Sequence, residues 1–239
     1  MSTIDVPGAV TTPVLRAHLS VPSGEGPWPA VVVLHEVFGL TDDVRAQADR
    51  LAAEGYLALA PDLYSAGGAR RCLLSTFRAL TSGEGGAFGD LEAVRVHLAG
   101  RPDCTGRVGV LGFCMGGGFA LLAAARGFDA SAPNYGPLPK DPERLLAGAC
   151  PVTASFGRRD LFFRGAAAEL EEALSGLGVE HDVVEYADAG HSFMNHHGLG
   201  PLGILERIAG FDYHQASAED AWARILRSFD THLRGAASG

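Results

Sequence analysis

The sequence predicts a doubly wound α/β fold, in which a mostly parallel sheet is flanked by helices. Two observations lead to this class. Short apolar runs alternate along the chain with longer segments of helical periodicity. Glycine, which permits the tight turns between such elements, is abundant at 32 of 239 residues. The chain length suits one large domain, so we expect residues 1–239 to form a single unit.

The expected strands are short segments bounded by turn signals. They comprise residues 14–21, 30–34, 56–60, 107–113, 152–156 and 182–186. The first has a mixed pattern and is expected to be partly exposed. The run at residues 30–34 is apolar throughout, which is typical of a strand buried on both faces.

Helical patterns fall between these strands, at residues 41–54, 90–98, 114–126, 166–177 and 218–233. Thr41 is the expected N-cap of the first helix, and Asp42 and Asp43 suit the positive end of its dipole. Ser217 and Asp220 resemble a capping box for the last helix. Residues 63–89 and 196–215 fit no element, and we interpret them as lids or binding loops.

Charge and composition exclude several classes of protein. The chain has 19 Lys and Arg against 28 Asp and Glu, a net charge of −9, which disfavours nucleic acid as a partner. No signal peptide and no membrane span are expected, so the predicted location is the cytoplasm. The four cysteines form no C-x-x-C pair, so neither a zinc site nor a disulfide is expected. We expect a monomer or small homo-oligomer.

The sharpest motif is the hexapeptide Gly-Phe-Cys-Met-Gly-Gly at residues 112–117. It lies between a predicted strand and a predicted helix, and it matches the nucleophile elbow G-x-S-x-G with Cys114 in place of serine. The helix N-terminus and a neighbouring histidine are expected to favour the thiolate. The alternative is a buried cysteine at a tight strand–helix junction. The elbow predicts an α/β-hydrolase fold.

A nucleophile of this kind needs a base and an orienting acid, which follow it in that fold in the order nucleophile, acid, base. Asp160 follows the predicted strand 152–156, and His191 follows the predicted strand 182–186. An Asx turn or helix cap is the alternative for Asp160, and an ordinary loop histidine for His191. Other candidates for the base are His35, His97, His196 and His197. His191, His196 and His197 lack the spacing and the further ligand expected of a metal site.

Glu36 lies just after the apolar run at residues 30–34, separated from it by His35. Burying a carboxylate without a partner is costly, so its position indicates a function, and the alternative is an exposed loop residue. An oxyanion formed during acyl transfer needs two convergent N–H donors. The backbone amides of Met115 and Val37 are the expected pair.

Four segments together resemble the dienelactone hydrolase family. They are His-Glu-Val-Phe-Gly-Leu at residues 35–40, the elbow at 112–117, Gly-Arg-Arg-Asp at 157–160 and Gly-His-Ser-Phe at 190–193. The resemblance extends over residues 14–233. It implies a triad of Cys114, His191 and Asp160, and a Glu36 that interacts with the resting thiol and is linked to its activation by substrate. It implies no metal or organic cofactor.

The resemblance is weaker at the residues that bind the substrate. The family reads a substrate carboxylate with arginines, one of them a few residues after the catalytic histidine, where this chain has Asn195. Arg78 is one candidate for the second arginine, beside Arg70 and Arg71. Phe38, Arg78 and Asn195 are the candidate substrate-binding residues.

The sequence therefore predicts a cysteine-dependent hydrolase of small carboxylic esters or lactones. It does not identify dienelactone as the substrate. A thioesterase or small peptidase on the same scaffold is the first alternative, because the triad serves any acyl transfer. A ligand-binding module without catalysis is the second.

Overall fold

The computed structural model describes residues 2–196 and 213–235, and its centre is one eight-stranded sheet of order β1-β2-β4-β3-β5-β6-β7-β8. The pairs from β4 through β3, β5, β6 and β7 to β8 are all parallel, whereas β2 pairs antiparallel with both β1 and β4. The strands are β1 Ser2–Val6, β2 Leu15–Ser20, β3 Trp28–Leu34, β4 Leu57–Pro61, β5 Cys104–Phe113, β6 Ala130–Asn134, β7 Val152–Gly157 and β8 His181–Tyr186. The predicted mostly parallel sheet is confirmed.

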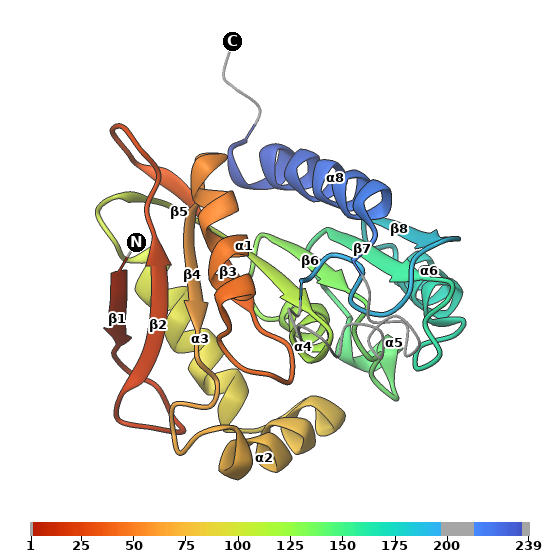
Figure 1. Ribbon diagram of the computed structural model, residues 1–239, viewed down its shortest axis with the longest axis horizontal. Helices are drawn as coiled ribbons and strands as arrows, with labels where there is room; N and C mark the ends of the chain where they lie inside the picture. Colours follow the sequence, from red (N-terminus) through yellow and green to blue (C-terminus); the bar gives the residue numbers. More distant parts are fainter. Residues whose placement is uncertain (1, 197–212, 236–239) are drawn as a thin grey trace.

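Helices cover both faces of the sheet (Figure 1). The helices are α1 Asp42–Ala53, α2 Ala69–Ser82, α3 Gly86–Ala99, α4 Met115–Ala123, α5 Pro142–Leu145, α6 Ala166–Leu177 and α8 Gln215–Leu233. Helices α1 and α8 pack on one face, and α3, α4 and α6 on the other. Within β3, Val31 and Val33 face the first layer while Val32 and Leu34 face the second, as the two-residue period of a strand requires.

Three expectations differ from the structure. Residues 63–89 are not one long loop, because α2 lies within them between Gly68 and Gly83, which both have positive φ. The predicted capping box at Ser217 is wrong, since His214 is the N-cap of α8 and its side chain accepts a hydrogen bond from the Ser217 N–H. Strands β1 and β6 were not predicted. Most of the segment 196–215 lies outside the described residues.

The N-terminal end of α1 follows the prediction closely. Thr41 is the N-cap, its side chain accepts a hydrogen bond from the Val44 N–H, and Asp42 and Asp43 occupy the first turn. Across the described part of the chain, no helix has both the length and the apolar character needed to cross a membrane.

Candidate active site

The elbow lies where β5 ends and α4 begins. Cys114 stands between them with φ 52° and ψ −117°, a conformation that is costly for a residue with a side chain. A Cβ added at Gly112 would overlap the carbonyl group of Gly116, and one added at Gly116 would overlap the carbonyl of Leu34. Both positions therefore require glycine, and the turn predicted from the motif is present.

Asp160, His191 and Cys114 form a connected row. The carboxylate follows the end of β7, is only 1% exposed, and its Oδ2 lies 2.7 Å from His191 Nδ1. Its Oδ1 accepts a hydrogen bond of 2.8 Å from the Phe162 N–H. His191 Nε2 lies 3.2 Å from Cys114 Sγ. With the Nδ1 proton directed at the carboxylate, Nε2 is placed to take the thiol proton.

Glu36 is buried beside this row. The side chain is 4% exposed, and its Oε1 accepts a 2.8 Å hydrogen bond from the hydroxyl of Ser192, the neighbour of His191. Burial raises the pKa of Glu36 to about 8, against the lowering effect of Ser192 and with a further rise from nearby Asp43. Near neutral pH, Glu36 is therefore mostly protonated.

The Cys114 thiol is held in its neutral form. Burial raises its pKa to about 12, and the negative charge of Asp160, joined by that of Glu36 when Glu36 is ionised, adds to the rise. The Met115 amide at the helix N-terminus lowers this pKa, as expected, but desolvation outweighs it, so the expected resting thiolate is not found. The backbone amides of Met115 and Val37 both act on the sulfur and lower its pKa. The two amides predicted to bind an oxyanion thus converge on the Cys114 sulfur.

A second hydrogen-bonded network anchors the loop that carries His191. The Tyr135 hydroxyl donates to Asn195 Oδ1, and Asn195 Nδ2 donates to Asp43 Oδ2. The other Asp43 oxygen accepts a 3.0 Å hydrogen bond from the His196 N–H. Asn195 is 1% exposed and its side chain is engaged within the protein, so its contact with substrate stays a prediction. Sequence reasoning missed Tyr135, which follows the unpredicted strand β6.

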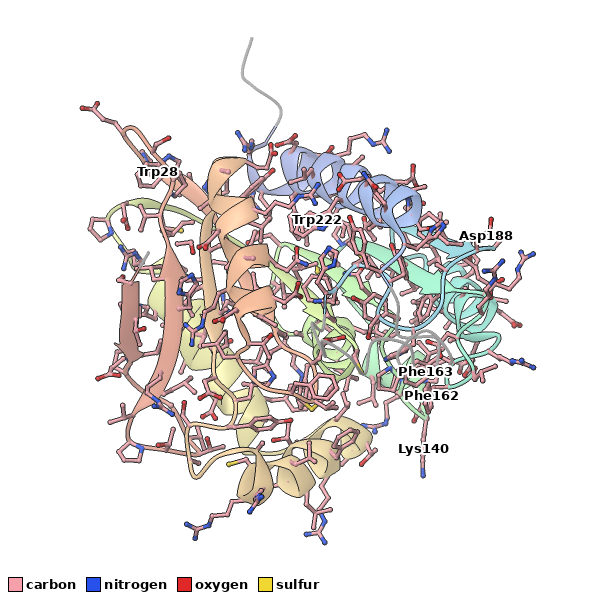
Figure 2. All side chains as sticks on the ribbon, in the orientation of Figure 1. Trp28, Lys140, Phe162, Phe163, Asp188 and Trp222 are labelled. Carbon is pink, nitrogen blue, oxygen red and sulfur yellow. The ribbon has the colours of Figure 1, made fainter. Side chains whose placement is uncertain are left out.

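Aromatic side chains lie beside the row of Asp160, His191 and Cys114. The rings of Phe162 and Phe163 lie 5.6 and 5.5 Å from the His191 ring, and Phe162 is 63% exposed. Figure 2 shows the two phenylalanines together on the segment before α6. Phe38, in the loop after β3, is also exposed. Arg78 is on α2 and lines a pocket of about 310 Å³ whose lining residues do not include Cys114, Asp160 or His191.

The other histidines proposed as bases have different places. His35 is fully buried and bonded to the backbone, His97 lies on α3, and the His196 ring stacks 3.9 Å from Tyr213. His197 lies outside the described residues. Among the residues that the structure describes, no cluster of three or more His, Cys, Asp or Glu could hold a metal ion.

The mostly parallel sheet, its two helical layers and the strand–turn–helix elbow define an α/β-hydrolase fold. The family model for the dienelactone hydrolase family matches residues 15–233. The chain belongs to the dienelactone hydrolase family, and it is a hydrolase of the class that acts on ester bonds.

Individual relatives agree with this assignment. A Rhodococcus opacus protein named "Carboxymethylenebutenolidase" is 31% identical over 239 residues, which cover 93% of this chain and 88% of the relative. An Escherichia coli (strain K12) protein named "Putative carboxymethylenebutenolidase" is 30% identical, over 89% of this chain and 80% of the relative. The crystal structure of "Putative Dienelactone Hydrolase" from Klebsiella pneumoniae superposes with a TM-score of 0.78 at 28% identity, covering 97% of this chain and 98% of that one.

Proposed function

We propose that this protein hydrolyses small carboxylic esters or lactones, with Cys114 as nucleophile, His191 as general base and acid, and Asp160 as the group that orients His191. The observation that carries the proposal is the continuous row of contacts, 2.7 Å from Asp160 to His191 and 3.2 Å from His191 to Cys114. This is the arrangement that nucleophilic catalysis requires.

The first half of the reaction forms an acyl-enzyme. His191 Nε2 takes the thiol proton while Cys114 Sγ bonds to the substrate carbonyl carbon, whose oxygen becomes an oxyanion. The amides of Val37 and Met115 bind that oxyanion. When the intermediate collapses, the C–O bond to the leaving group breaks, and the imidazolium gives its proton to the departing alkoxide. The product is a thioester on Cys114.

The second half releases the acid. His191 takes a proton from water as the water oxygen attacks the thioester carbonyl, and the same two amides hold the second oxyanion. The C–S bond then breaks, and the imidazolium returns its proton to the sulfur. With its pKa raised to about 12, the resting sulfur is a thiol and has to give up its proton to His191 for the attack. Glu36 controls this step electrostatically, since its negative charge opposes the thiolate and its protonation removes that opposition.

The surroundings of the row favour a substrate without a carboxylate. The charge of Asp160 that acts on Cys114 is negative, and Glu36 adds a second negative charge once it is deprotonated. Asn195 is engaged with Tyr135 and Asp43 inside the protein. The exposed ring of Phe162 beside His191 offers an apolar contact to the group next to the scissile bond.

Cys114→Ala tests the nucleophile. With activated esters, we expect kcat/KM to fall about 10³-fold or more, because the covalent route is lost. Cys150→Ala is the matched control, since Cys150 lies next to the far end of α4, where its N–H donates to the Ala124 carbonyl. A Cys114→Ala variant with full esterase activity contradicts the proposal. The rates of the wild-type enzyme on matched ester, thioester and amide substrates then show which of these bonds it cleaves fastest.

A further inference from the structure

His35 makes two hydrogen bonds that determine where its proton lies. The residue follows β3 and is fully buried. Its Nδ1 lies 2.6 Å from the carbonyl oxygen of Glu36, and its Nε2 lies 3.1 Å from the Leu63 N–H. A carbonyl only accepts and an amide N–H only donates, so Nδ1 carries the hydrogen and Nε2 does not. Burial lowers the pKa of His35, in agreement with a neutral ring.

The carbonyl that His35 holds belongs to the peptide group of the oxyanion donor. The Glu36 C=O and the Val37 N–H are parts of one planar trans unit, and they point in opposite directions. Fixing the oxygen toward His35 therefore fixes the Val37 N–H on the opposite side. That side faces the Cys114 sulfur, whose pKa the Val37 amide lowers.

Neighbouring contacts hold the same turn. The Gly39 N–H donates to the Glu36 carbonyl at 3.2 Å, which closes the turn that carries Val37. The Tyr64 hydroxyl donates to the Val37 carbonyl at 3.1 Å, and the Tyr64 ring lies 4.9 Å from the His35 ring. Leu63 and Tyr64 follow β4, so the end of the adjacent parallel strand supports the turn after β3.

We propose that His35 is a positioning residue for oxyanion binding, which aims the Val37 amide at the reacting carbonyl by holding the Glu36 oxygen through Nδ1–H. His35 acts through the backbone and touches no substrate. The proposal rests on the proposed function in one respect, the role of the Val37 amide as an oxyanion donor. The sequence offered His35 as one candidate for the base, and the proposal gives this buried residue a different role.

A pair of nearly isosteric variants isolates the contact. In His35→Asn the side-chain amide nitrogen takes the place of Nδ1 and still donates to the Glu36 oxygen, whereas His35→Leu has no donor. Both variants lose the acceptor for Leu63, so their difference reports on the Glu36 contact alone. We expect kcat for an activated ester to fall about 10- to 100-fold in His35→Leu, and only a few-fold in His35→Asn, with KM little changed in either.

A second readout reports on the oxyanion directly. Trifluoromethyl ketones add to a catalytic thiol and form a tetrahedral oxyanion, so they mimic the intermediate. We expect their inhibition constant to rise in His35→Leu in proportion to the loss of kcat/KM, because both depend on the same amide. His97→Leu and His97→Asn on α3 are the matched controls, and we expect both readouts to be unchanged in them.

Equal losses in the Asn and Leu variants, or an unchanged inhibition constant in His35→Leu, would overturn the proposal. If neither variant folds, ¹⁵N spectra of the histidine rings in the wild-type enzyme provide the test. A neutral His35 with its proton on Nδ1 supports the proposal, and a proton on Nε2 overturns it. These failures are distinct from failure of the proposed function, which is signalled by Cys114→Ala retaining activity.

Discussion

Two buried carboxylates lie beside Cys114, and they differ in their partners. Asp160, after β7, meets His191 Nδ1 with one oxygen and the Phe162 N–H with the other. Glu36, after β3, accepts from the neutral hydroxyl of Ser192, and burial outweighs that contact, so its pKa rises to about 8. Two acids of similar burial therefore have different tasks. In the proposed mechanism Asp160 orients His191, while Glu36 changes its charge near neutral pH.

The largest expected effect is that of Asp160→Asn. An amide donating to Nδ1 would force the His191 proton onto Nε2, where it faces the sulfur and blocks proton transfer. We expect kcat to fall about 10³- to 10⁴-fold, measured with an activated ester. Asp90→Asn is the control, because Asp90 is equally buried but binds the backbone of Val10 and Thr11. A loss below tenfold in Asp160→Asn would remove the distinction between the two carboxylates.

Glu36→Gln tests whether the charge of Glu36 changes near neutral pH. The pKa of Glu36 is about 8 in the folded protein and near 4.5 when it is exposed by unfolding. Between these values the unfolded chain has released a proton that the folded chain retains, so rising pH destabilises the wild type. We expect the wild-type free energy of unfolding, relative to that of Glu36→Gln, to fall by about 1.4 kcal/mol per pH unit in this window. Above the folded-state pKa of Glu36, the difference between the two proteins should no longer change with pH. Parallel urea-unfolding profiles of the two proteins between pH 5 and 8 would contradict this.

Asn195→Ala tests whether the His191 loop is anchored from inside. The substitution leaves the Tyr135 hydroxyl and Asp43 without their contacts to Asn195. We expect a loss of about 1–3 kcal/mol in the free energy of unfolding, together with a lower kcat from a displaced His191. If stability is instead unchanged and only KM rises, Asn195 contacts substrate as the sequence had suggested.

The smallest expected effect is that of Phe162→Ala. Its ring is exposed and lies beside His191, so its removal takes away an apolar contact for substrate while the catalytic row stays in place. We expect KM for aromatic esters to rise a few-fold, by about 1 kcal/mol of binding, with kcat unchanged and acetate esters unaffected. Leu74→Ala on α2 is the control, because its side chain is similarly exposed at 64%. Equal effects on acetate and aromatic esters would contradict the proposed contact.

Much of the fold follows from local pattern. The apolar run of β3 and the glycines of the elbow carry strong signals, because burial on both faces and a crowded turn leave few other residue choices. Strand β6, with the sequence Ala-Ser-Ala-Pro-Asn, has no β-branched or aromatic residue and therefore gave no strand signal. Helix α2 is flanked by glycines with no side-chain cap, so its ends resembled loop.

The site was predictable in its order along the chain but not in its electrostatics. Cys114, Asp160 and His191 follow from an elbow and two strand ends. The raised pKa of Cys114 depends on how deeply Glu36 and the sulfur are buried together, which no local pattern encodes. The network through Tyr135 joins residues 60 and 152 positions apart in the chain, so only the folded structure brings them together.

The central claim is that Cys114 becomes acylated during turnover. Rapid mixing with an activated ester, followed by acid quench and mass spectrometry of the Cys114 peptide, tests it directly. We predict a mass increase equal to one acyl group on Cys114, formed before steady state and absent from Cys72, Cys104 and Cys150. Turnover with Cys114 unmodified throughout, or with the acyl group on another residue, would contradict the account.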